Sequence, residues 1–293
     1  MIAAAALSRR VRGLELRARK NVGHIGEGAY RTAFKGSGVE FQEIREYAPG
    51  DDIRTIDWNV TARHGRPYVK RFATEREQTI LLVVDGSAST RFGTAEGASK
   101  RDLIAEVAAT LAYAAVQNED RVGLILFGNE VEAYVPPGRG VQHALRIMRD
   151  VLQFTPRLPG TDLAKALEFL DRVTPRRVFA FLISDFMAAD ASRQLRLSGK
   201  RHNLVALVVN DRAEAELPDC GLVEFEEPES GERLTLDTSD REVRAAFAGS
   251  WKSREMHLLA GARAADVDHF AITAGDDYFP DLLRVLRTHA TRR

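Results

Sequence analysis

From residue 78 onward, short apolar runs alternate with longer stretches of helical periodicity. Five of the apolar runs are candidates for buried strands: TILLVVD (79–85), RVGLILFG (121–128), RVFAFLISD (177–185), NLVALVVN (203–210) and DHFAIT (268–273). Alternation of such runs with helices is typical of βαβ units, in which helices cover both faces of a mostly parallel sheet. The pattern predicts a doubly wound α/β domain over residues 78–293.

The helices between these strands are visible in the spacing of apolar residues. One is marked by four-residue steps: Leu103, Val107, Leu111 and Ala115. Another is expected over residues 161–173, where Thr161 or Asp162 would cap its first turn. Residues 211–240 interrupt the alternation with turns and short polar strands, and we interpret them as a surface insertion.

Residues 22–77 lack this rhythm and are rich in glycine and charge. Apolar and polar residues tend to alternate over residues 38–47 and 66–77, which favours short strands over helices. The pattern predicts a small β-rich module. Pro49 and Gly50 mark a turn between its two strand candidates.

Three aspartates of this module invite two interpretations. Asp51, Asp52 and Asp57 favour helix capping and ion pairs with nearby arginines such as Arg45 and Arg54. A second metal site is the alternative interpretation.

The charge is balanced over the whole chain, with 42 Lys and Arg against 42 Asp and Glu. No overall field therefore indicates nucleic acid or a membrane as the main partner. Residues 1–35 are locally basic, with eight Lys and Arg against Glu15 and Glu27. We treat residues 1–21 as a basic N-terminal segment, for which a solvated helix end is favoured over a docking surface for an acidic partner.

The single cysteine, Cys220, has no partner for an intramolecular disulfide, which fits a reducing compartment. The opening MIAAAAL is shorter than the apolar core of a signal peptide, and no later apolar stretch reaches the length of a membrane crossing. We therefore expect a soluble, cytoplasmic protein.

Polar side chains gather where the predicted strands end. Asp85 ends one strand and is followed at alternate positions by Ser87 and Ser89, while Asp185 ends another strand. Thr161 begins the helix after the loop RLPGTD. Ligands in open parallel sheets collect beyond the carboxyl ends of the strands, so these five residues meet at one edge if the two strands are neighbours.

Five oxygen side chains without histidine or cysteine are typical of a site for a hard cation such as Mg²⁺, with Mn²⁺ or Ca²⁺ as alternatives. Two carboxylates balance the divalent charge, and such a site can leave one coordination position open for an acid from another protein. The plainer interpretation of Asp85, Ser87 and Ser89 is a strand-end turn with capping side chains.

The run DGSAS, with the later GTD and ISD, resembles the metal-ion-dependent adhesion site of von Willebrand factor A domains. That pattern is Asp-x-Ser-x-Ser, then Thr, then Asp, and all five positions are matched. The resemblance implies that Ser87, Ser89 and Thr161 touch the metal, while Asp85 and Asp185 act largely through bound water. It also implies the doubly wound α/β fold.

Longer stretches resemble a bacterial family known as domain of unknown function fifty-eight, over about residues 10–285. They are GSGVEFQEIREYAPGDDIRTIDWNVTARHGRPYVKRFATERE, DRVGLILF, SDF and ELPDCGLVEFEEPESGE. Proteins of this family are typically paired with MoxR-type AAA+ ATPases. The resemblance implies an adaptor that grips the ATPase or its substrate through the metal, and not an enzyme.

Two other functions remain as alternatives. A phosphatase or phosphotransferase of the haloacid dehalogenase type would use Asp85 as its nucleophile with magnesium, but it generally needs a second aspartate where this chain has Ser87. A structural scaffold would need no metal.

Overall fold

The computed structural model describes residues 2–34, 41–72, 77–93, 99–188 and 190–291. The chain divides into two compact units. The first joins residues 1–34 to residues 78–292, and we call it the sheet unit. The second holds residues 35–77, and we call it the small unit.

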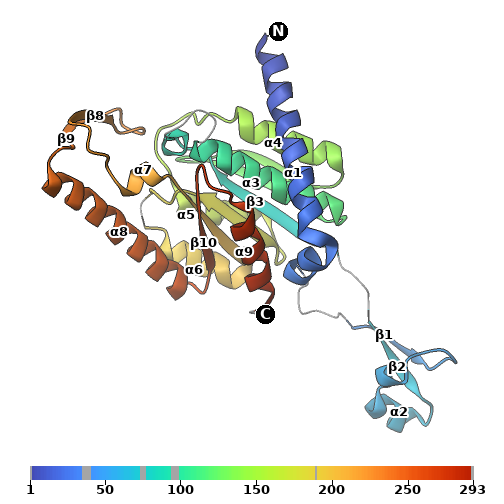
Figure 1. The fold of residues 1–293 in the computed structure, drawn as a ribbon. Coiled ribbons are helices and arrows are strands. Elements are labelled where there is room, and N and C mark those ends of the chain that lie inside the picture. Colours follow the sequence, from blue (N-terminus) through green and yellow to red (C-terminus); the bar gives the residue numbers. More distant parts are fainter. Residues whose placement is uncertain (1, 35–40, 73–76, 94–98, 189, 292–293) are drawn as a thin grey trace. The chain divides into compact units, whose positions relative to one another are not determined.

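A six-stranded sheet forms the centre of the sheet unit, with the strand order β10-β7-β6-β3-β4-β5 (Figure 1). All neighbouring strands are parallel except β4 and β5. The five predicted strands are present: β3 (Thr79–Asp85), β4 (Arg121–Phe127), β6 (Phe179–Ser184), β7 (Asn203–Asn210) and β10 (Asp268–Thr273). The predicted α/β class with a mostly parallel sheet is therefore confirmed.

One edge strand was not anticipated. Strand β5 (Val131–Gly138) pairs antiparallel with β4 and contains Pro136 and Pro137. Proline lacks the N–H that a sheet ladder requires, so within sheets it is tolerated mainly on edge strands. Two prolines in a sequence therefore argue against a strand, which is why β5 was not predicted.

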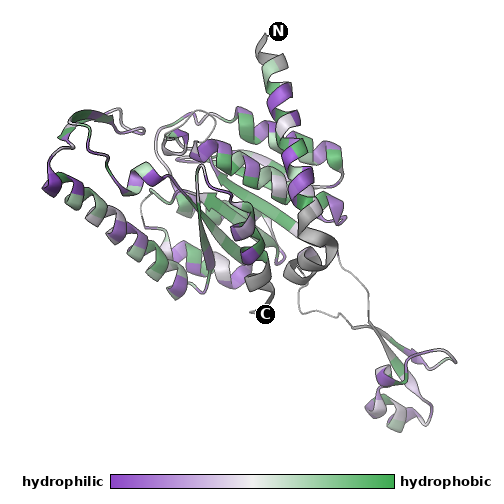
Figure 2. Cartoon of the chain, in the orientation of Figure 1, coloured by the Kyte–Doolittle hydropathy of each residue, from purple (hydrophilic) through white to green (hydrophobic). Residues whose placement is uncertain are grey.

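Helices cover both faces of the sheet. Successive side chains of a strand point to opposite faces, and in β3 the side chains on both faces are apolar. Ile80, Leu82 and Val84 of β3 lie in one hydrophobic cluster, and Leu81 and Val83 lie in the other. The first cluster includes residues from four helices: α1 (Ile2–Phe34), α3 (Lys100–Gln117), α4 (Val141–Gln153) and α9 (Phe279–Thr291). The second includes residues from three: α5 (Leu163–Val173), α6 (Ser192–Arg201) and α8 (Arg241–Ala264). Figure 2 shows hydrophobic strands between helices of mixed character.

Helix α1 crosses the expected boundary between residues 21 and 22, so residues 22–34, which were assigned to the β-rich module, continue the N-terminal helix. Its packing on the sheet unit explains this difference. Leu14 is buried, and the Tyr30 hydroxyl donates a hydrogen bond of 2.8 Å to Asp120. Such tertiary contacts outweigh the low helix propensity of the glycines in this stretch.

The basic residues of α1 meet acidic residues of α3. Arg10 pairs with Asp102 at 2.9 Å, and Arg17 pairs with Glu106. Part of the local basic charge is therefore matched within the sheet unit, where a solvated helix end was expected.

The small unit contains β1 (Phe41–Glu46), η1 (Ile53–Thr55), α2 (Trp58–His64) and β2 (Tyr68–Phe72), with β1 and β2 antiparallel. Its aspartates cap and pair as predicted. Asp52 accepts from the Arg54 N–H and begins η1, and Asp57 begins α2. Asp51 and Arg45 form an ion pair of 2.7 Å.

The segment expected as an insertion, residues 211–240, holds a short helix and a two-stranded hairpin. Helix α7 (Arg212–Ala215) is followed by β8 (Leu222–Glu226) and β9 (Arg233–Asp237), which pair antiparallel. We call residues 222–237 the hairpin. Within the described part of the chain, no helix has the length and apolar character that a membrane span requires.

Candidate functional site

Strands β3 and β6 are neighbours, with Val84 opposite Ile183, so their carboxyl ends meet at one edge of the sheet. Asp85 lies there with 1% of its surface exposed. Its carboxylate accepts hydrogen bonds from the Ser87 N–H at 2.9 Å and from the Ser184 hydroxyl at 2.6 Å. The predicted adjacency of the two strand ends is thus confirmed.

The two serines of DGSAS present their hydroxyls together. Ser87 Oγ lies 3.1 Å from Ser89 Oγ, and both residues are buried at the start of the short helix η2 (Ala88–Arg91). The Thr90 hydroxyl donates to the Ser87 carbonyl at 2.7 Å and closes this turn. Gly86 is required by packing, because a Cβ atom at this position would collide with the Phe154 ring.

Asp185 is held by a buried cation that the sequence analysis did not single out. Lys100, the first residue of α3, is fully buried, and its Nζ lies 2.7 Å from Asp185 Oδ2 and 2.5 Å from Glu214 Oε1. The second Asp185 oxygen accepts the Met187 N–H at 3.1 Å. Lys100 therefore holds the aspartate that follows β6 close to a glutamate of α7.

The loop that carries Thr161 reaches the same edge through a residue of the hairpin. The Glu229 carboxylate accepts from the Ser89 N–H at 3.1 Å and from the Gly160 N–H at 2.5 Å. This one carboxylate connects the DGSAS turn to the residue before Thr161. Glu229 was not predicted at the site, since its sequence neighbours indicated a solvated turn.

The electrostatics of the edge favour a cation. Burial, together with the charge of Asp185, raises the pKa of Asp85 to about 7. Burial also raises the pKa of Glu214, against the opposing effect of Lys100. The buried carboxylates of Asp85 and Asp185 lie close together, which costs free energy unless positive charge offsets their repulsion. Lys100 supplies one such charge.

The residues fit a hard divalent ion. In an octahedral Mg²⁺ site with bonds of 2.0–2.1 Å, adjacent oxygen ligands lie about 3 Å apart, close to the separation of the Ser87 and Ser89 hydroxyl oxygens. The described residues contain no group of three or more His, Cys, Asp or Glu that would hold a metal by themselves. An ion at this edge would therefore need the serine hydroxyls among its ligands, and that serines touch a metal stays a prediction.

Three residues of this edge escaped the sequence analysis: Lys100, Glu214 and Glu229. They come from α3, α7 and the hairpin, and no local pattern marks Lys100 or Glu229. The one available signal was the acidic residue at the third position of α7. Glu214 completes a capping box with Asp211, which positions its carboxylate.

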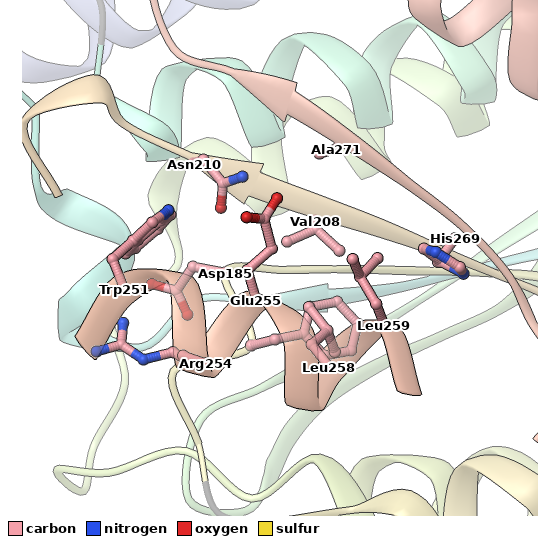
Figure 3. A pocket seen from close by; sticks show the side chains of 11 residues that line it. Asp185, Val208, Asn210, Trp251, Arg254, Glu255, Leu258, Leu259, His269 and Ala271 are labelled. Carbon is pink, nitrogen blue, oxygen red and sulfur yellow. The ribbon is translucent and has the colours of Figure 1, made fainter. Parts of the chain in front are cut away.

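A pocket lies beside Asp185, between α8 and strands β7 and β10 (Figure 3). Its walls combine apolar side chains such as Phe186 and Leu258 with Asn210 and Glu255. Phe186 directly follows Asp185 and has a φ of 53°, a strained conformation for a bulky residue. Asp185, which pairs with the buried Lys100, thus also contributes to the lining of this pocket.

Comparison with known proteins identifies relatives over nearly the whole chain. The uncharacterized protein Rv1480 of Mycobacterium tuberculosis (strain ATCC 25618 / H37Rv) is 32% identical over 292 residues, which cover 98% of this chain and 90% of the relative. The uncharacterized protein YeaD of Bacillus subtilis (strain 168) is 26% identical over 106 residues, 36% of this chain and 24% of the relative.

Among solved structures, an aerotolerance-related membrane protein from Bacteroides fragilis is similar over 74% of this chain and 100% of its own, with 14% identity and a TM-score of 0.49. The SpRpn10 VWA domain is similar over 74% of this chain and 95% of its own, with 13% identity and a TM-score of 0.35. The profile of a family described as protein of unknown function DUF58 matches residues 43–257. The resemblance of the longer stretches to this family is confirmed, and the chain belongs to the DUF58 family.

Proposed function

We propose that this protein is a non-enzymatic, metal-dependent protein–protein interaction module. The observation that carries the proposal is the meeting of Asp85, Ser87, Ser89 and Asp185 at the carboxyl edge of β3 and β6, with two serine hydroxyl oxygens 3.1 Å apart. Carboxylates and hydroxyls without histidine or cysteine suit a hard cation.

Ser87, Ser89 and Thr161 would hold Mg²⁺ or Mn²⁺ directly, and Asp85 and Asp185 would act through water. When bound, the ion supplies a positive charge that attracts an acidic side chain. The Ser184 hydroxyl orients the Asp85 carboxylate, and the Lys100 ammonium orients that of Asp185. Both carboxylates are therefore held in place before an ion binds.

The partner we propose is a MoxR-type AAA+ ATPase or its protein substrate, which would offer an acidic residue to the metal. Support comes from the resemblance of the DGSAS, GTD and ISD motifs to an adhesion site and from membership of the DUF58 family. We further propose that the protein acts in the cytoplasm as an adaptor for protein remodelling or complex assembly.

Metal binding tests the first part of the proposal. We expect Mn²⁺ titration, followed by electron paramagnetic resonance, to give one site in the wild-type protein. Ser87→Ala should weaken it by about tenfold or more, as expected for loss of a metal ligand or of its support. Ser250→Ala, which changes an exposed serine of α8, is the matched control.

Two further results decide the role. We expect the ATPase to co-purify with the wild-type protein in Mg²⁺ and not with Ser87→Ala or in chelator. Equal co-purification in chelator would support a metal-independent scaffold instead. Turnover of a phosphoester that disappears in Asp85→Asn would replace the adaptor role with the phosphotransferase alternative.

A further inference from the structure

The turn of the hairpin is built to hold Glu229 in one direction. Glu227 accepts the backbone N–H groups of Glu229 and Ser230 with its carboxylate, and the Gly231 N–H donates to the Glu227 carbonyl at 2.8 Å. Gly231 adopts a φ of 73°, which favours glycine. In this tight turn Pro228 and Ser230 are exposed, whereas Glu229 is half-buried.

Glu229 is half-buried because its carboxylate meets two backbone N–H groups of the candidate site, those of Ser89 and Gly160. We call these two groups the amide pair. Ser89 lies in η2 and Gly160 in the loop before α5, 140 and 69 residues away from Glu229 in sequence. Gly160 has a φ of 96°, a conformation strained for other residues. Paired N–H donors recognise a carboxylate with charge-assisted hydrogen bonds.

The rest of the hairpin has little to hold it in place. Leu222 and Leu234 are 75% and 59% exposed, and no hydrophobic side chain of residues 222–237 is among the buried ones. Its two ends are held together, because the buried Thr238 donates its hydroxyl to the Gly221 carbonyl at 2.8 Å. The hairpin is thus closed at its base and attached near its tip through Glu229, and Figure 1 shows the tip turned toward the start of α3.

We propose that the amide pair is a carboxylate-binding position and that Glu229 of the same chain occupies it. A glutamate side chain of a partner binds the amide pair only when the hairpin tip moves away from it. The partner half of this statement rests on the proposed function, whereas the contact of Glu229 with the amide pair does not. The fit of a glutamate follows from the occupant itself, since a carboxylate on a two-carbon stem already spans both N–H groups.

Hydrogen exchange of the full chain in chelator tests the contact without metal or partner. Glu229→Ala removes the acceptor of two amides, so we expect peptic segments that contain Ser89 and Gly160 to exchange about tenfold faster or more. Glu229→Gln keeps one acceptor oxygen and should give an intermediate rate. Glu226→Ala is the control, because it removes an exposed carboxylate from the same hairpin. Unchanged exchange in Glu229→Ala would overturn the proposal.

Acetate is the probe for an incoming carboxylate. Added to Glu229→Ala, it should restore protection of both segments relative to chloride at equal ionic strength, while the wild-type protein stays unchanged. Acetate without effect on the variant would overturn entry by an external carboxylate. Failure of the proposed function is a separate result. If Glu229→Ala loses protection but the wild-type protein binds no Mn²⁺, Glu229 still occupies the amide pair and the proposed metal dependence is wrong.

Discussion

Lys100 carries the buried positive charge of the candidate site, and its removal would leave Asp185 and Glu214 without the cation that pairs with both of them. Breaking a buried pair on one side costs about 3–5 kcal/mol, because an uncompensated charge stays in the interior. We therefore expect Lys100→Met to lower the free energy of unfolding by about that amount in urea titrations at pH 7.

The control for this variant is Lys165→Met. Lys165 is half-exposed and lies 3.5 Å from Asp162, so its loss should cost less than about 1 kcal/mol. Equal stability of the two variants would contradict the buried pair. Acidification should narrow the difference between them, because protonated carboxyl groups no longer need the ammonium.

Gly86 gives a second test at the residue scale. A methyl group at this position collides with the Phe154 ring, and overpacking of this kind costs about 1–3 kcal/mol. We expect Gly86→Ala to lower the thermal midpoint, and the loss to shrink when Phe154→Ala opens the space. Gly249→Ala, in α8 with open space around it, should be neutral or stabilising by up to about 1 kcal/mol.

At the residue scale, the sequence predicted the site residues at the strand ends. It did not predict those that lie in other elements, such as Lys100 of α3 and Glu229 of the hairpin. Asp85 ends one buried strand and Asp185 directly follows another, so the edge rule for parallel sheets places them together. Glu229 lies in a polar turn whose composition indicates solvent. Only the folded chain shows that this turn reaches the N–H groups of Ser89 and Gly160.

Helix α1 allows a prediction at the scale of an element. Leu14 is 4% exposed within the hydrophobic cluster that covers one face of the sheet, and Leu16 is 60% exposed on the same helix. Leu14→Ala should cost about 2–5 kcal/mol of stability, as is usual for a buried leucine, and Leu16→Ala should cost almost nothing. Chemical denaturation of both variants is the measurement, and similar losses would contradict the docking of α1.

The same helix shows where sequence patterns stop being informative. The central strands are continuous apolar runs, and their bounds were predicted to within one or two residues. Helix α1 contains Gly23, Gly26 and Gly28, and its stability comes from contacts with α3 and α9 that are distant in sequence. Strand β5 was missed because its two prolines argue locally against a strand, and only its position at the sheet edge permits them.

On the scale of the whole molecule, the two units differ in how much apolar surface they bury. Among the described residues of the small unit, Val69 is the one buried hydrophobic side chain, whereas the sheet unit has two extensive clusters. Units with so small a core are marginally stable. We therefore expect amides of β1 and β2 to open at a lower free energy than those of β3 and β6.

Metal addition should increase the difference in stability between the two units, because the candidate ligands all belong to the sheet unit. A ligand that binds only the folded state stabilises it by about 2.7 kcal/mol at a concentration 100 times its dissociation constant. At that concentration, Mg²⁺ should slow exchange of the most protected β3 and β6 amides about 100-fold and leave β1 and β2 unchanged. Ser87→Ala, which weakens the site about tenfold or more, should reduce the slowing to about tenfold or less at the same Mg²⁺ concentration. Equal slowing in both sheets would mean that the two units open as one, because stabilisation at the metal would then reach residues that contribute no ligand.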